Sequence, residues 1–244
     1  MGKSFFSPPK PSVILFDFDN TLYPYDPCNI VATRCALEIA SNRFNLPFDE
    51  VQNSFNLARN LVKERVGCVA ARHSRLLYFH CMLEELGLGS QVEEALRLEQ
   101  IYWRSYLIHM ELFPYAAEFL ANLRSYGIRL GLVTDLTAQI QFRKLLALGL
   151  SSTFDAVVTS EEVNGEKETG APYLLMSQKM ALGKDDNVWM VGDSDADITG
   201  SKTYLNAFTI CMSAGISEIP LNADAVFADF FNLNKAVDMV FKNA

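Results

Sequence analysis

The stretch Val13-Ile-Leu-Phe-Asp-Phe-Asp-Asn-Thr-Leu22 is the most informative part of this chain. Its first four residues are apolar, as in a buried strand of an α/β sheet, and turn-forming residues follow them. Ligand sites in such sheets lie just beyond the carboxyl ends of the strands. We therefore expect the carboxylates of Asp17 and Asp19 to project into a crevice at that edge of the sheet.

The close spacing of Asp17 and Asp19 has an electrostatic consequence. Two adjacent carboxylates repel each other when both are ionised, so such a site needs either a shared proton or a bound cation. A hard divalent ion such as Mg2+ prefers oxygen ligands and commonly binds phosphate oxygens together with one or two carboxylates. By itself, an Asp-x-Asp sequence at a strand end fits a helix cap with a solvated turn as well as it fits a ligand site. Polar residues at later strand ends favour the ligand site.

Length and composition bound the class of protein. The 244 residues are enough for one large domain or for a core with a smaller partner domain. Half of the residues are hydrophobic and 20% are charged, which is ordinary for a soluble globular protein. The formal net charge of -8, with acids and bases mixed along the chain, argues against a nucleic acid polymer or an anionic membrane as partner. A small anionic substrate stays compatible with this charge.

Cysteine usage and the N-terminal segment point to the cytoplasm. The five cysteines show neither a Cys-x-x-Cys pair nor zinc-binding spacing, so we expect reduced thiols that mostly act as small buried hydrophobes. Residues 1–11 are short and polar and do not resemble a signal peptide. The sequence contains no apolar run long enough to span a bilayer.

The hydrophobic pattern predicts two blocks. After residue 113, apolar strands at 128–133, 156–158, 187–191 and 207–212 alternate with helices at 115–126, 137–147, 173–180 and 198–204. Repeated strand-helix-strand units imply a parallel, doubly wound sheet with right-handed crossovers.

The segment between the first strand and residue 113 reads as helix throughout. Helices are expected at 29–44, 48–66, 70–86 and 91–109, with breaks at glycine, asparagine and proline residues between them. Such a block is a helical bundle inserted after the first strand. We therefore predict an α/β, Rossmann-like core formed by residues 1–22 and 113–244 and an α-helical cap formed by residues 23–112.

Polar residues at further predicted strand ends support a shared site. Thr134 ends a second buried strand, where its hydroxyl and the following amides could hold phosphate oxygens, although a plain helix cap fits the same pattern. Asp193 and Asp197 follow a third strand, after Gly192, whose freedom to turn would direct both acids back to the crevice. Lys167 lies in a polar loop, and in a crevice with several carboxylates and a phosphate it would supply compensating positive charge.

Together these segments resemble a known family. Asp17-Phe-Asp-Asn-Thr21, Thr134, Lys167 and Gly192-Asp-x-x-x-Asp197 occur in the order typical of the haloacid dehalogenase (HAD) superfamily of phosphohydrolases, subfamily I with a helical C1 cap. The resemblance spans nearly the whole chain. It implies a Mg2+-dependent phosphomonoesterase that hydrolyses a small phosphorylated metabolite through an aspartyl-phosphate. Dehalogenation is not expected, because dehalogenating relatives lack an acid at the position of Asp19.

The resemblance also implies a role for each motif residue. Asp17 is expected to be the nucleophile that attacks phosphorus. Asp19 is expected to be the general acid toward the leaving alcohol and then the base for the hydrolytic water. Thr134 and Lys167 are expected to act in catalysis by binding the transferring phosphoryl group. Asp135 is counted with them as a substrate-binding residue, although it stands where a neutral Asn is common and adds negative charge.

The implied metal site uses carboxylates from two strand ends. Mg2+ is expected to bind Asp17, Asp193 and the main-chain carbonyl of Asp19, with Asp197 orienting the site or acting through water. One departure from the family pattern concerns the loop after Lys167, which lacks the usual Pro-x-Pro and is therefore expected to be more mobile.

The sequence is compatible with several substrates and with more than one oligomeric state. The segment Asp19 to Pro24 is similar to that of pyrimidine 5'-nucleotidases, so a nucleoside 5'-monophosphate is one candidate, beside sugar phosphates and phosphoglycolate. A phosphomutase or phosphotransferase is the alternative reaction class, and a noncatalytic binding protein is the least favoured reading. The chain could be a monomer or a homodimer. The polar cap residues that could face the crevice and select the substrate are Tyr23, Tyr25, Arg72, His73 and Arg75.

Overall fold

A six-stranded parallel sheet forms the centre of the computed structural model, which describes residues 8–214, 220 and 222–242. The strand order is β3-β2-β1-β4-β5-β6, and every neighbouring pair is parallel. The strands are β1 (Val13–Phe16), β2 (Arg129–Thr134), β3 (Ala156–Thr159), β4 (Val188–Gly192), β5 (Phe208–Met212) and β6 (Ala225–Phe227). The chain order reverses at β1, which has β2 on one side and β4 on the other, as in doubly wound sheets. The predicted α/β fold class is confirmed.

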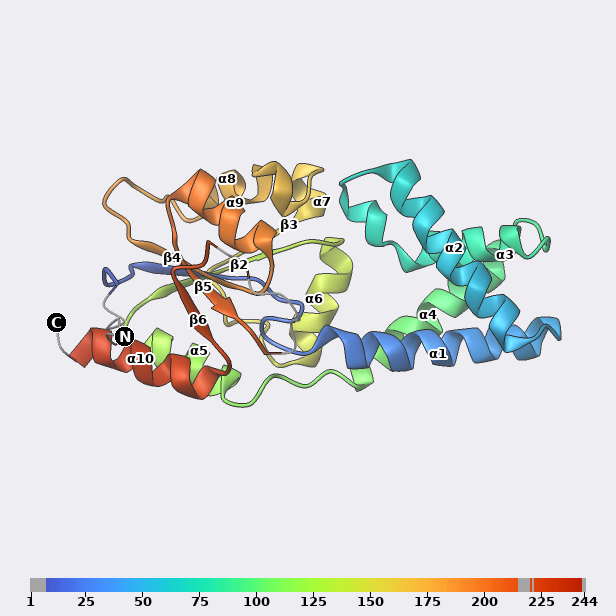
Figure 1. The fold of residues 1–244 in the computed structure, drawn as a ribbon, viewed down its shortest axis with the longest axis horizontal. Helices are drawn as coiled ribbons and strands as arrows, with labels where there is room; N and C mark the ends of the chain where they lie inside the picture. The colour runs from blue at the N-terminus through green and yellow to red at the C-terminus, as the bar shows by residue number, and fades with distance from the viewer. Residues whose placement is uncertain (1–7, 215–219, 221, 243–244) are drawn as a thin grey trace.

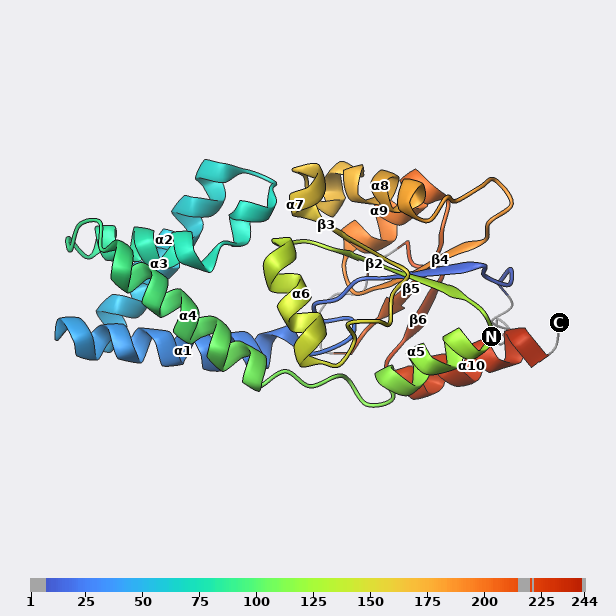
Figure 2. The same cartoon turned by 180° about the vertical axis from the view of Figure 1, so that it is seen from behind.

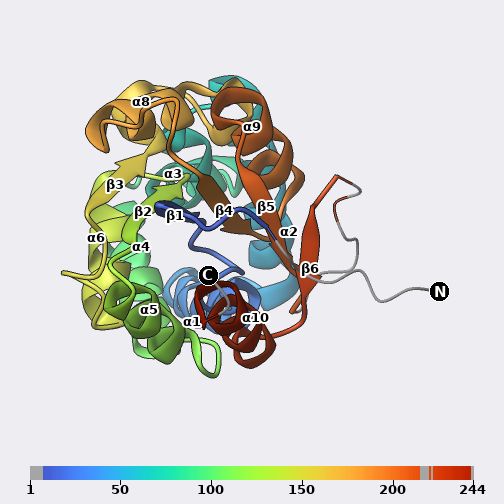
Figure 3. The ribbon, with the colours of Figure 1, turned by 90° about the vertical axis from the view of Figure 1, so that its left-hand side faces the viewer.

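Helices cover both faces of the sheet, as Figures 1 and 3 show. One layer contains α8 and α9, and the opposite layer contains α5 and α10. The core helices are α5 (Ala116–Ser125), α6 (Ala138–Ala147), α7 (Ser160–Val163), α8 (Ala171–Lys179), α9 (Asp195–Leu205) and α10 (Phe230–Lys242), with a short 3-10 helix η2 (Lys167–Thr169). Alternate residues of β1 serve the two faces, since Leu15 shares a buried cluster with Met176 of α8 and Phe16 packs edge-on against Phe119 of α5. Both sides of β1 are therefore buried, as its continuous apolar run predicts.

The remaining helices lie together at one end of the elongated molecule, beyond α6 (Figures 1 and 2). They are α1 (Tyr25–Phe44), α2 (Phe48–Val66), the 3-10 helix η1 (Ala70–His73), α3 (Arg75–Glu85) and α4 (Val92–Ile108). We call this group the cap. Helix α1 packs on α4, and α2 packs on α3. The residue limits predicted for core and cap, 22/23 and 112/113, stay a prediction.

Local structure departs from the sequence prediction at several elements, which include the short helices α7 and η2. The helix expected over 70–86 is divided at Ser74, whose side chain accepts a hydrogen bond from the Leu77 amide at 3.3 Å and caps α3. Near the C-terminus, β6 and α10 are absent from the sequence prediction. Helix α10 buries Phe230, Leu233 and Val237, whose spacing is that of an amphipathic helix.

In the part of the chain that the structure describes, none of the helices combines the length and the apolar character needed to cross a bilayer.

Candidate active site

The carboxyl ends of three neighbouring strands bring the predicted site residues to one edge of the sheet. Asp17 follows β1, Thr134 ends β2, and Asp193 follows β4. Because β1 pairs in parallel with both β2 and β4, these three ends lie side by side. The Asp17 amide extends the ladder by donating to the Val191 carbonyl at 2.9 Å. The sheet topology thus brings together groups that lie far apart in the sequence.

Lys167 is the positive centre of this group. Its Nζ lies 2.5 Å from Asp17 Oδ1 and 2.6 Å from Asp197 Oδ1, and all three side chains are buried. Burial alone would lower the pKa of this lysine, but the charges of Asp17 and Asp197 raise it well above the usual value. Lys167 therefore stays protonated and partly neutralises two carboxylates.

The loop that carries Lys167 is anchored by polar contacts on both sides. The Lys167 amide donates to Asp135 Oδ1 at 3.1 Å. Immediately before it, Glu166 Oε2 accepts a hydrogen bond from Arg72 Nη1 at 3.0 Å, and Glu166 Oε1 lies 2.8 Å from His73 Nε2. These contacts to the cap hold the loop in the absence of the Pro-x-Pro sequence. The Asp135 carboxylate is thus used in positioning Lys167, and burial raises its pKa.

Three carboxylates converge beside Lys167. Asp17, Asp193 and Asp197 each have a carboxylate oxygen within 4.8 Å of those of the other two. The Thr21 hydroxyl lies 2.9 Å from Asp17 Oδ2 and 3.3 Å from Asp193 Oδ1. Burial, followed by the charge of Asp197, raises the pKa of Asp193 to about 6, and burial raises that of Asp17 well above its usual range. One ammonium does not balance three carboxylates, so the chemistry of this donor set fits a divalent cation.

Asp197 is held from two directions. Its Oδ2 accepts from the Ser194 amide at 3.1 Å while the Asp197 amide donates to the Ser194 hydroxyl at 3.3 Å, which forms a capping box at the start of α9. The same hydroxyl lies 2.6 Å from Oδ2. Its Oδ1 is bonded to Lys167. Gly192 is needed for close approach, because a Cβ atom there would lie 2.4 Å from Asp197 Cβ. The φ of Gly192 lies outside the positive region, so close packing and not the predicted sharp turn explains this glycine.

Asp19 lies apart from the three acids and has a different partner. Both of its carboxylate oxygens accept hydrogen bonds from Lys144 Nζ at 2.9 Å, and Oδ1 also accepts a short hydrogen bond from the Tyr23 hydroxyl. The Tyr106 hydroxyl lies 2.7 Å from that of Tyr23. Burial raises the pKa of Tyr23 well above its usual value, so this hydroxyl stays protonated and donates.

Lys144 is the main residue that the sequence analysis missed. Its side chain is fully buried, and burial lowers its pKa despite the nearby Asp19. A signal existed, because Lys144 and Gln141 share the buried face of α6 with Ile140 and Leu145. A lysine at such a position needs a buried partner.

Thr134 is buried, and its hydroxyl is oriented toward α6. It accepts a hydrogen bond from Gln141 Nε2 at 2.6 Å and lies 3.4 Å from the Asp135 carbonyl oxygen. Gln141 Nε2 also donates to that carbonyl at 2.7 Å. The end of β2 is thereby fixed to the helix that carries Lys144.

The cap residues singled out from the sequence divide into two groups. Tyr25, His73 and Arg75 line a cavity of about 210 Å³ together with Asp19 and Asp135. The other two candidates make structural contacts at the boundary between cap and core. They are Tyr23, bonded to the Asp19 carboxylate, and Arg72, bonded to Glu166.

Comparison with known proteins shows what this chain is similar to. A sequence model described as haloacid dehalogenase-like hydrolase matches residues 14–209. The ribulose-1,5-bisphosphate 5-phosphatase of Halopiger xanaduensis is 38% identical over 192 residues, covering 78% of this chain and 80% of that protein. The glyceraldehyde 3-phosphate phosphatase of Methanothermobacter thermautotrophicus is 27% identical over 223 residues, covering 91% of this chain and 90% of that protein.

Solved structures agree with the fold. The magnesium-bound structure of the HAD-hydrolase YfnB from Bacillus subtilis matches with a TM-score of 0.70 at 19% identity, covering 94% of this chain and 100% of that chain. At this identity the likeness concerns the fold alone, and it includes both the sheet and the cap.

Proposed function

The chain belongs to the haloacid dehalogenase-like hydrolase family, and from that premise we propose that it hydrolyses the phosphate monoester of a small metabolite. One observation carries the proposal: the Asp17 carboxylate is bonded to Lys167 at the carboxyl edge of the sheet, with Asp193 and Asp197 beside it. A carboxylate held in this way can act as a nucleophile. The two relatives named above are both phosphatases of phosphorylated sugars, which supports the same reaction class.

The proposed first step is attack by Asp17 on phosphorus. A bond forms between a carboxylate oxygen and phosphorus as the bond to the leaving alcohol breaks, and Asp19 gives that alcohol a proton. Water then attacks the aspartyl-phosphate while Asp19 takes a proton from it, so that phosphate leaves and Asp17 is regenerated. Lys167 balances negative charge on the nucleophile and on the phosphoryl oxygens throughout.

Asp19 is suited to the second of these steps in the arrangement observed. Its carboxylate accepts hydrogen bonds from Lys144 and Tyr23, which hold its oxygens in position to remove a proton from water. A carboxyl group at this position is useful for phosphate esters, whose leaving alcohol needs a proton. It is not needed for organic halides, because a halide leaves without a proton. Hydrolysis of phosphate esters is therefore proposed over dehalogenation.

Magnesium is proposed as the cofactor. Asp17 and Asp193 would hold the ion together with the main-chain carbonyl of Asp19, and Asp197 would orient the group, since its own oxygens bond Ser194 and Lys167. When bound, Mg2+ would neutralise charge on the phosphoryl oxygens. Burial is the largest cause of the raised pKa values of Asp17 and Asp193, and the charge of Asp197 adds to it, so a bound cation would favour the ionised form of both carboxyl groups.

The cysteines bear on the cellular compartment, and the relatives bear on the substrate. Free cysteines fit a cytoplasmic enzyme, since the described structure shows five unpaired thiols. The phosphatases to which the chain is similar act on sugar phosphates, so sugar phosphates lead the candidate substrates. Nucleoside 5'-monophosphates stay an alternative on the strength of the segment Asp19 to Pro24.

A panel assay tests the proposal. Phosphate release is measured with Mg2+ from p-nitrophenyl phosphate, ribulose 1,5-bisphosphate, glyceraldehyde 3-phosphate, phosphoglycolate and uridine 5'-monophosphate, for the wild type and for Asp17→Asn. Release by the wild type and loss in the variant support the proposal. A wild type that releases phosphate from none of these esters contradicts it.

A further inference from the structure

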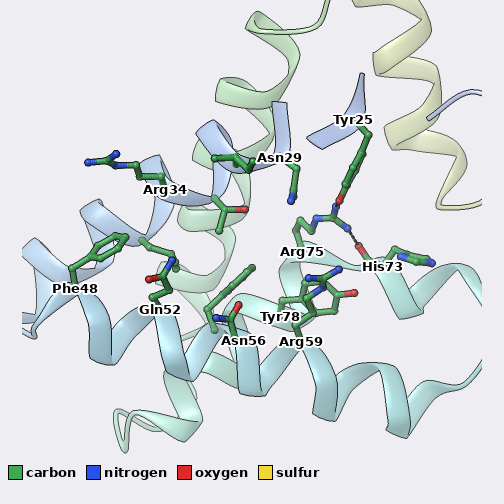
Figure 4. Close-up of a pocket in the computed structure, with 14 residues that line it drawn as sticks. Tyr25, Asn29, Arg34, Phe48, Gln52, Asn56, Arg59, His73, Arg75 and Tyr78 are labelled. Carbon is green, nitrogen blue, oxygen red and sulfur yellow. Dashed lines mark hydrogen bonds between the residues drawn. The ribbon is translucent and has the colours of Figure 1, made fainter. Parts of the chain in front are cut away.

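The cavity beside Asp19 has two walls of opposite character. The core contributes Asp19, Asn20, Asp135, Leu136 and Lys144. The cap wall consists mainly of basic side chains, which are the cations Arg59, Lys63 and Arg75 and the imidazole of His73, with Tyr25 beside them. A second cavity of about 330 Å³ adjoins it within the cap and shares Tyr25, Arg59, His73 and Arg75 (Figure 4). Together they offer room for a small metabolite that reaches from Asp19 into the cap.

The acids around this cavity already have partners. Asp19 is paired with Lys144, and Asp135 accepts the Lys167 amide. Glu166, which lies behind the cap wall, is paired with Arg72 and His73. The acids therefore compensate the cationic side of the cavity only in part: the charge of Glu166 raises the pKa of Lys63, but burial and the charges of three arginines lower it overall.

Three cations of the cap wall lack an acidic partner. Among the residues that the structure describes, Arg59, Lys63 and Arg75 have no carboxylate oxygen within ion-pair distance, whereas most other arginines and lysines near the cap do. Arg59 and Lys63 are four residues apart on α2 and so project from the same face of that helix. Arg59 is exposed and Lys63 is half-buried, so an anion from solution can reach both side chains.

Arg75 is the most informative of the three. Its side chain is only 6% exposed, yet its guanidinium bonds to the Tyr25 hydroxyl and the His73 carbonyl and to no acid among the described residues. Four aromatic rings surround it, with centroids 5.2 to 6.0 Å from its Cζ. A buried charge without a counterion is costly, and aromatic rings offset only part of that cost. Arg75 lines both cavities, where an anion could reach it.

The mutual repulsion of these cations appears in Lys63. Burial lowers its pKa, and the nearby charges of Arg59, Arg72 and Arg75 lower it further. A bound anion would relieve this repulsion. The polar face of α2 continues from Arg59 into the second cavity through Gln52 and Asn56, which Figure 4 shows beside it.

We propose that Arg59, Lys63 and Arg75 form a subsite for a second phosphate group, so that the preferred substrate is a small sugar or polyol bisphosphate whose other phosphate is cleaved at Asp17. This rests on the proposed phosphatase function and narrows its substrate class. A phosphate dianion fits better than a carboxylate, because three cations converge and a phosphate offers three acceptor oxygens. The subsite disfavours substrates with a single anionic group, such as glyceraldehyde 3-phosphate.

The test compares substrates that differ in the second phosphate. For the wild type, kcat/KM for ribulose 1,5-bisphosphate is expected to exceed that for ribulose 5-phosphate by about tenfold or more. The double variant Arg59→Gln/Lys63→Gln should lose most of this ratio. Arg65→Gln serves as the matched control, because Arg65 is exposed on the same helix and does not line the cavity. This control should leave the ratio unchanged. Exposed or half-buried positions are chosen because replacing the buried Arg75 could prevent folding.

Failure of the subsite and failure of the proposed function give different results. A wild type that cleaves both esters with equal kcat/KM, or a double variant that keeps the full ratio, overturns the subsite while the phosphatase function stands. If the double variant lowers kcat/KM for phosphoglycolate as much as for ribulose 1,5-bisphosphate, the subsite does not prefer a phosphate to a carboxylate, and that part of the proposal is overturned. If no ester is cleaved, calorimetric binding decides: ribulose 1,5-bisphosphate should bind Asp17→Asn more tightly than ribulose 5-phosphate does, and equal affinities contradict the subsite.

Discussion

Replacing Glu166 with Gln should loosen the contact between cap and core. The Glu166 carboxylate, 5% exposed, bonds Arg72 at 3.0 Å and lies 2.8 Å from His73, both in or next to the 3-10 helix of the cap. It also directly precedes Lys167, which is bonded to Asp17. Glu166→Gln keeps the shape of the side chain and removes its charge. The substitution therefore removes the charge and one of the two acceptor oxygens of this link.

The magnitude follows from the kind of hydrogen bond that is lost. A hydrogen bond to a charged group contributes about 1.5–3 kcal/mol, and a neutral one about 0.5–1.5 kcal/mol. Changing both bonds of Glu166 from charged to neutral would thus cost about 2 kcal/mol in total. Solvent screening reduces this cost, because the side chains of Arg72 and His73 are 31% and 33% exposed. A loss of about 1–2 kcal/mol corresponds to a factor of roughly 5–30 in the opening equilibrium of this contact.

The pH dependence has a definite sign. Burial would raise the pKa of Glu166, but the hydrogen bonds and charges of His73 and Arg72 lower it below its ordinary value of 4.5. A carboxyl group whose pKa is depressed by folding stabilises the fold above its unfolded pKa. This contribution is lost as the pH falls through the folded-state pKa, so the difference in stability between wild type and Glu166→Gln should shrink below about pH 4.5.

Hydrogen exchange and denaturant unfolding measure these effects. Amides of residues 70–73 should exchange about 5–30 times faster in Glu166→Gln, and the free energy of unfolding should fall by about 1–2 kcal/mol. Glu168→Gln is the matched control, because Glu168 is exposed in the same loop. Unchanged exchange in Glu166→Gln, or an equal change in Glu168→Gln, would refute the reasoning.

Three further changes test the site. Asp19→Asn should lower the rate of hydrolysis by about 10²–10⁴-fold for esters with poor leaving groups and much less for p-nitrophenyl phosphate. Equal losses of rate for both kinds of ester would count against Asp19 as the general acid. Lys144→Met, which keeps the volume but not the bond to Asp19, should lower kcat by about 10–100-fold with the fold retained by circular dichroism; an unchanged kcat would remove Lys144 from the positioning of Asp19. Chelation with EDTA should abolish turnover and added Mg2+ should restore it, whereas turnover that persists in chelator would contradict the proposed cofactor.

The fold and the convergence of the site could be predicted because each depends on local sequence and on topology. The apolar run ending at Phe16 predicts a doubly buried strand, and parallel strands place their polar ends at one edge. Asp17, Asp193 and Lys167 could therefore be grouped from the sequence. Their chemical roles are not tested by the fold and stay proposals.

Contacts between side chains from distant segments could not be predicted in this way. Lys144 meets Asp19 only because α6 packs against the loop after β1, and its position on an apolar helix face was the single signal. Close packing against Asp197 explains Gly192, and this contact exists only in three dimensions. Arg75 has no acidic partner among the residues that the structure describes, and this too depends on how the cap helices assemble.

The most direct test of the account is to identify the phosphorylated residue during turnover. Enzyme mixed with a cleavable phosphate ester and Mg2+ is quenched in acid, digested and examined by mass spectrometry. We expect one phosphoryl group on the peptide that contains Asp17, absent from Asp17→Asn and lost as substrate is exhausted. Steady turnover without any phosphoryl group on that peptide, or with one on a different residue, would contradict it.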